Sequence, residues 1–105
     1  MPLTPTGFVH QQEIKSAIQS VESRFAQQVH HINFSFGEDW TGAPSIFFRV
    51  VVRDEASQID RLGELAEQVS ISLMNGAKTD ENGLRAYFDF RSVAEQAKLQ
   101  EPAWA

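Results

Sequence analysis

The pattern of apolar and polar residues changes its period several times along the chain, and residues 45–54 form its most apolar stretch. Every second residue from Ile46 to Val52 is apolar, and Phe47 and Val51 make the opposite register half apolar as well. A strand that is apolar on one face and partly apolar on the other is typical of the middle of a sheet. We therefore predict that residues 45–54 form the central strand.

Two long helices are predicted from apolar residues that recur three and four positions apart. The first covers residues 10–30. The second begins at a capping-box-like pair, Ser57 and Asp60, and ends in a left-handed turn at Asn75-Gly76. The predicted buried stripes are Ile14, Ala17, Ile18, Val21, Phe25 and Val29 in the first helix, and Ile59, Leu62, Leu65, Ala66, Val69, Leu73 and Met74 in the second.

Strict alternation over residues 31–36 and 84–91 predicts two further strands. A loop with two glycines and a proline joins the first of them to the central strand as a hairpin. Ser92 and Glu95 form a second capping box, which predicts a short helix over residues 93–100.

The resulting order, α-β-β-α-β-α, predicts one α+β domain of 105 residues, with 1–9 as a flexible lead-in and 101–105 as a tail. A crossover through the second helix places the last strand parallel to the central one. We expect a three-stranded mixed sheet of order 1-2-3, with both main helices on one face. Order 2-1-3, which would make the sheet wholly antiparallel, remains an alternative, although the half-apolar outer register of the central strand favours 1-2-3.

Composition narrows the class of protein. A hydrophobic fraction of 42% and eight Phe predict a packed soluble domain rather than a disordered chain. The absence of Cys excludes disulfides and thiol chemistry, and it fits a reducing cytoplasm. No apolar run is long enough to cross a bilayer, so no membrane association is expected. The net charge of −5 disfavours binding to duplex nucleic acid.

The sheet face opposite the two helices is the candidate functional surface, because it gathers four of the nine basic residues and one acid. Three interpretations remain open. The face is buried against a second protein, it is covered by its own ion pairs between Asp89 and Arg49 or Arg53, or it binds single-stranded nucleic acid or a small anion. The candidate interface or ligand-binding residues are Phe47, Arg49, Val51, Arg53, Arg85, Tyr87, Asp89 and Arg91.

Other polar residues do not predict a reaction. His30 and His31 are adjacent and point in different directions, so no metal site is expected. Glu38 and Asp39, beside Trp40, are interpreted as solvated turn residues. The chain has no phosphate loop and no nucleophile motif, so we expect neither an enzyme nor a cofactor.

The order α-β-β-α-β is similar to that of type II KH-like domains, which grip nucleic acid through a Gly-x-x-Gly loop. The nearest match, Gly63-Glu64-Leu65-Ala66, lacks the second glycine and carries an acid where a phosphate would lie. The sequence therefore predicts a non-enzymatic protein–protein interaction module, as a homodimer or a subunit of a small complex. The alternative is binding of single-stranded nucleic acid or an anionic ligand through the arginine and tyrosine residues of the sheet face.

Overall fold

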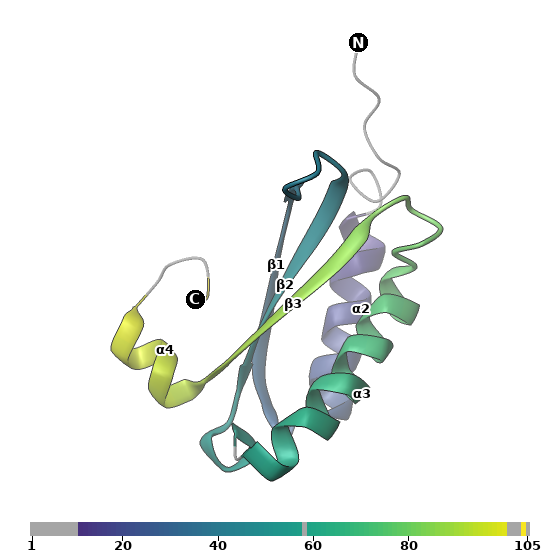
Figure 1. Cartoon of the computed structure of the whole chain (residues 1–105). Coiled ribbons are helices and arrows are strands. Elements are labelled where there is room, and N and C mark those ends of the chain that lie inside the picture. Colours follow the sequence, from purple (N-terminus) through teal and green to yellow (C-terminus); the bar gives the residue numbers. More distant parts are fainter. Residues whose placement is uncertain (1–10, 58, 101–103, 105) are drawn as a thin grey trace.

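The computed structural model describes residues 11–57, 59–100 and 104, without the side chains of residues 56–61. A three-stranded sheet carries two long helices on one face, and a short helix lies on the opposite side at one end (Figure 1). The elements are α2 (Gln11–Arg24), β1 (Val29–Glu38), β2 (Pro44–Val52), a 3₁₀ turn η1 (Asp54–Ser57), α3 (Ile59–Ala77), β3 (Arg85–Ser92) and α4 (Val93–Leu99).

The strand order is β1-β2-β3, with β1 antiparallel and β3 parallel to β2. This confirms the predicted α+β fold with a mixed sheet of order 1-2-3, and it excludes order 2-1-3. The central position of β2 follows from its composition, because a strand with few polar side chains needs cover on both faces and at both edges.

The hydrophobic core lies between the sheet and the two long helices. From β2, the side chains of Ile46, Phe48 and Val50 are at most 1% exposed, and Ile14 of α2 and Leu73 of α3 are fully buried with them. Each fully buried side chain of this size stabilises the fold by about 1.5–3 kcal/mol. The apolar register of β2 that the sequence indicates is therefore the face that holds the helices.

The first helix is shorter than predicted, because it ends at Arg24 and β1 begins at Val29. The backbone N–H of Val29 still donates to the carbonyl of Phe25 at 2.7 Å, so the helical spacing of apolar residues continues through the turn. Val29 is buried from the strand, 2% exposed, and a bulge follows it before His31. His30 therefore lies in a strand and not at a helix end.

The predicted left-handed end of the second helix at Asn75-Gly76 is also wrong. The helix continues to Ala77, and the left-handed residue is Lys78, with φ of 51°. Gly76 serves a close contact between α2 and α3 instead, because a Cβ there would lie 3.0 Å from the Cβ of Ala17.

The capping box that begins α4 is confirmed. The Ser92 hydroxyl accepts from the backbone N–H of Glu95 at 3.1 Å, and the Ser92 N–H donates to the Glu95 carboxylate at 3.3 Å. The predicted cap at Ser57 and Asp60, the lead-in and most of the tail lie outside the described residues. No helix in the described ranges combines the length and apolar character that a bilayer span requires.

Candidate binding surface on the open face of the sheet

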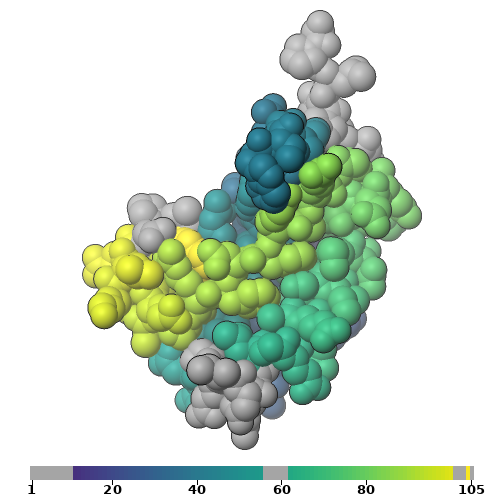
Figure 2. Space-filling view, in the orientation of Figure 1, coloured from purple at the N-terminus to yellow at the C-terminus, as the bar shows by residue number. Residues whose placement is uncertain are grey.

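The sheet face opposite α2 and α3, here called the open face, runs from the β1–β2 loop at one end to α4 at the other (Figure 2). Strand register sets side chains from the three strands next to one another in rows. From the loop end to the α4 end, the rows are Ser35, Phe47 and Tyr87, then Asn33, Arg49 and Asp89, then His31, Val51 and Arg91.

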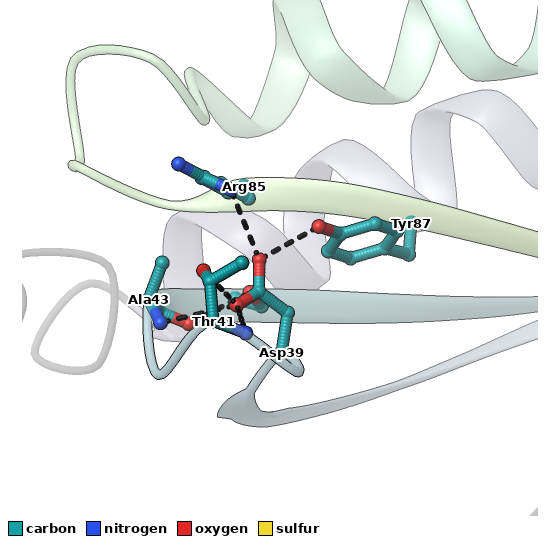
Figure 3. A network of polar contacts seen from close by, with 6 residues as sticks. Asp39, Thr41, Ala43, Arg85 and Tyr87 are labelled. Carbon is teal, nitrogen blue, oxygen red and sulfur yellow. Dashed lines mark hydrogen bonds and ion pairs between the residues drawn. The ribbon is translucent and has the colours of Figure 1, made fainter.

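The carboxylate of Asp39 holds the loop end together (Figure 3). Its Oδ1 accepts from the Thr41 hydroxyl at 2.6 Å, from the Thr41 N–H at 2.9 Å and from the Ala43 N–H at 3.1 Å. Its Oδ2 accepts from the Tyr87 hydroxyl at 2.7 Å and from the Arg85 guanidinium at 3.3 Å. Asp39 thus fixes its own turn and ties the β1–β2 loop to β3.

These contacts shift two ionisation equilibria. Hydrogen bonds from the Thr41 and Tyr87 hydroxyls hold the pKa of Asp39 well below its usual range, although desolvation acts the other way. The same bond to Asp39 raises the pKa of Tyr87, with desolvation in support and Arg85 opposing. The Asp39 side chain has no exposed surface, while that of Arg85 is 58% exposed. A carboxylate that is held ionised and accepts five hydrogen bonds is a structural group and a poor proton acceptor.

Three aromatic side chains gather beside this loop, and we call Trp40, Phe47 and Tyr87 the aromatic patch. The Phe47 and Tyr87 rings stack with centroids 5.5 Å apart, and Trp40 lies 5.7 Å from Tyr87. Phe47 also packs against Gly37, where a Cβ would come within 3.3 Å of the ring. Trp40 is 83% exposed although its neighbour Asp39 is fixed by hydrogen bonds. The patch therefore presents a large apolar surface on a support that is held by hydrogen bonds.

The next row carries opposite charges that do not pair. Within the described part of the chain, no hydrogen bond or ion pair joins Asp89 to Arg49 or Arg53. The Asp89 carboxylate accepts from the backbone N–H of Phe90 at 3.0 Å, and the Arg53 guanidinium donates to the carbonyl of Ala26 at 3.0 Å. A shallow hollow of about 320 Å³ is lined by Arg49, Asp89 and the adjacent aromatic rings. Among the described residues, no ion pair therefore covers the row of Arg49 and Asp89.

The row nearest α4 is covered by Trp104 of the same chain, which is 3% exposed. The Arg91 guanidinium lies 4.2 Å from the centroid of its ring, and a His31 ring nitrogen donates to its carbonyl at 2.5 Å. Val51 lies between His31 and Arg91 in the register, beneath these contacts, and is 1% exposed. We call His31, Val51 and Arg91 the Trp104 seat.

The eight residues predicted for the site thus separate into three groups. Phe47, Arg49, Arg85, Tyr87 and Asp89 lie together at the loop end and in the row beside it. Val51 and Arg91 belong to the Trp104 seat, and Arg53 lies just after the end of β2, where it bonds the carbonyl of Ala26. The expectation that Val51 would be open to a partner needs correction, because the chain itself buries this side chain.

Sequence reasoning overlooked two parts of the site. It interpreted Asp39 as a solvated turn residue, and it left Trp104 in a tail without a place to dock. An Asp two residues before a Thr and four before an Ala-Pro is a signal for an Asx turn, but its contact with β3 across 48 residues has no local signature. For Trp104 the signal is one large aromatic side chain in an otherwise small and polar segment.

The remaining candidates form no site. His30 and His31 share a short contact, 2.7 Å between their Nδ1 atoms, and among the described residues no three His, Asp or Glu side chains are grouped to hold a metal ion. The segment that aligns with the KH-like loop, residues 63–66, lies inside the continuous helix α3, where it cannot form a phosphate-binding loop. Comparison with protein-family models, with curated proteins and with solved structures finds no match to the chain.

Proposed function

We propose that the protein is a non-enzymatic protein–protein interaction module that forms a homodimer through the aromatic patch and the adjoining row of Arg49 and Asp89. The observation that carries the proposal is Trp40, a tryptophan that is 83% exposed beside a fixed turn. Trp, Tyr and Arg are the residues that most often dominate the energy of protein interfaces. A rigid support lowers the entropy that is lost when such side chains bind.

A second copy is favoured as the partner because the surface is complementary to itself. Arg49 and Asp89 are neighbours in the register, yet no ion pair joins them among the residues that the structure describes. Across a two-fold axis each would face the opposite charge of the other copy, with the aromatic patches in contact between them. A cytoplasmic setting belongs to the same proposal, since a chain without cysteine needs no oxidising compartment.

The test is a charge exchange between two variants. Arg49→Asp and Asp89→Arg should each be monomeric under conditions in which the wild-type chain is dimeric, and an equimolar mixture of the two should form a heterodimer. Molar mass is measured by light scattering across a size-exclusion peak over a hundredfold range of concentration. Glu67→Arg, which reverses an exposed charge on α3, is the control and should leave the dimer unchanged. A wild-type chain that stays monomeric throughout, or a mixture that does not associate, rejects the proposal.

Single-stranded nucleic acid or an anionic ligand is the second candidate, and one observation favours it. The stacked rings of Phe47 and Tyr87 and the guanidinium of Arg49, which has no ion pair with any described residue, line one hollow, an arrangement that suits a base and its phosphate. The ratio of absorbance at 260 and 280 nm, measured across the same peak, separates the two functions. If the wild-type peak absorbs in excess at 260 nm, and if Trp40→Ala and Arg49→Asp lose that excess, the protein binds nucleic acid and the homodimer proposal is rejected.

A further inference from the structure

The short C-terminal helix is attached to the sheet in an unusual way. No side chain of α4 is buried, and Leu99 is 50% exposed. The described contacts that fix the segment include the buried Trp104, the bond from the Ala94 N–H to Asp54 at 3.0 Å, the bond from Arg91 to Gln96 at 3.5 Å and the capping box at Ser92. Among the described residues from 93 onward, Trp104 is therefore the one buried apolar side chain.

The Trp104 seat has the features of a recognition site for that side chain. Arg91 supplies a cation over the ring, His31 supplies a donor to the carbonyl of the same residue, and the buried Val51 lies between the two in the register. The ring contact and the carbonyl contact come from different strands, β3 and β1. Together they define both the side chain and the direction of the backbone that carries it.

The seat also adjoins the proposed dimer surface. Arg49 and Asp89 occupy the row between the aromatic patch and the seat, so removal of Trp104 would make one continuous surface from the β1–β2 loop to α4. A partner that displaced Trp104 from the seat would also contact Val51, which is buried in the present structure.

We propose that the Trp104 seat is an exchangeable binding site for a peptide segment that bears a tryptophan, and that the chain's own C-terminal segment occupies it as an intramolecular competitor. The chemistry of the ligand follows from what fills the seat here, namely an indole for Arg91 and a backbone carbonyl for His31. The inference deepens the proposed function and rests on it for its biological role, because occupancy of the seat controls how much of the open face a partner reaches.

The test supplies the segment in trans. The full-length Trp104→Ala chain, labelled with ¹⁵N, is titrated with an acetylated and amidated peptide of residues 98–105, and with the same peptide carrying Ala in place of Trp. Saturable shifts of the backbone amides of His31, Val51 and Arg91 are expected with the Trp peptide and not with the Ala peptide. The wild-type chain should bind the Trp peptide about tenfold more weakly, because a tethered competitor acts at an effective concentration on the order of millimolar.

Two variants in the Trp104→Ala background make the result specific. Arg91→Ala should weaken the peptide at least fivefold, whereas Arg49→Ala, one row away, should change binding less than twofold. No shifts in the Trp104→Ala chain, or equal affinity in that chain and in the wild type, would overturn the proposal. If the Trp104→Ala chain loses its folded spectrum, Trp104→Leu keeps an apolar side chain and takes its place.

Failure of this test is distinguishable from failure of the proposed dimer. Trp40 lies in the aromatic patch, at the other end of the open face from the seat. Trp40→Ala should therefore abolish self-association and leave peptide binding to the Trp104→Ala chain within twofold. If the seat binds the peptide but the protein is monomeric, the homodimer is rejected and this inference stands. If the protein is dimeric but the seat does not bind the peptide, this inference alone is rejected.

Discussion

The two ends of the open face differ in how far their apolar side chains are covered. At the loop end, the aromatic patch is supported by hydrogen bonds to Asp39, and Trp40 remains 83% exposed. At the α4 end, the apolar Val51 is 1% exposed, and Trp104 contacts both of its register neighbours, His31 and Arg91. Two tryptophans on one sheet face therefore have opposite environments. The comparison separates a half of the open face that the chain covers with its own Trp104 from a half whose tryptophan remains exposed.

The sharpest way to break this comparison is to place a carboxylate at matched positions on the same face of β2. Val51→Asp should lower the free energy of unfolding by about 3 kcal/mol, because it buries a carboxylate whose desolvation an ion pair with the neighbouring Arg91 offsets only in part. Phe47→Asp should cost about 1–2 kcal/mol, since its ring is only half-buried. Urea unfolding followed by circular dichroism gives both values. Equal losses would mean that Trp104 does not cover Val51 in solution.

The two tryptophans provide the next comparison. Trp104→Ala should cost about 1–3 kcal/mol, because a buried indole outside the core between the sheet and the long helices leaves a site that relaxes more easily than a core cavity. Trp40→Ala should change stability by no more than about 0.5 kcal/mol, as is usual for an exposed side chain.

Fluorescence of the same two variants reports each environment separately. The single tryptophan left in Trp40→Ala should emit at shorter wavelength and resist quenching by iodide, whereas the one left in Trp104→Ala should be quenched readily. Similar quenching in the monomeric variants would contradict the assignment of a covered and an open half.

A smaller effect on stability, seen only at acidic pH, should come from Asp39, which supports the loop end. Because the pKa of Asp39 is lower in the folded protein than in the unfolded chain, its contribution to stability is complete above the unfolded value of about 4. That contribution is lost as the pH falls from there through the folded value. Asp39→Asn should therefore be less stable at neutral pH and should lose less further stability on acidification below about pH 4.

Thr41→Ala serves as the graded control for Asp39. Its hydroxyl makes the largest contribution to the low pKa of Asp39, so this variant should give an acid slope between those of the wild type and Asp39→Asn. Thermal melting temperatures measured from pH 2 to pH 6 give the three slopes. Identical slopes for the wild type and Asp39→Asn would show that the carboxylate does not support the loop.

The fold was predictable from sequence to a greater extent than the site. The alternation of β2 and its half-apolar outer register are local signals, and they are sufficient for the mixed sheet and for the face that holds the helices. The end of the first helix was misplaced, because Phe25 and Val29 keep helical spacing on both sides of a turn.

The division of the open face could not be predicted, because it depends on contacts between distant residues. Asp39 meets Tyr87 across 48 positions, and His31 meets Trp104 across 73. Alternation in β2 shows that Phe47 and Val51 share a face, but it contains no information about which of them another part of the chain covers. Such a choice is made by tertiary packing, which local periodicity does not record.

The smallest difference should separate the two arginines of β2 and β3 that face the same side. Arg91→Gln removes the cation from the Trp104 ring and should cost about 0.5–1 kcal/mol, because the pair is partly shielded from water. Arg49→Gln leaves the monomer within about 0.5 kcal/mol of the wild type, since its guanidinium stabilises no contact within the described chain. Both are measured by urea unfolding at concentrations where the protein is monomeric, in low and in high salt. The loss in Arg91→Gln should persist in high salt, because a cation in contact with a buried ring is screened less than an exposed one. If the two variants were equally stable, or if Arg49→Gln were the less stable, the cation over Trp104 would contribute nothing to the stability of the Trp104 seat. The indole alone would then account for the burial of Val51.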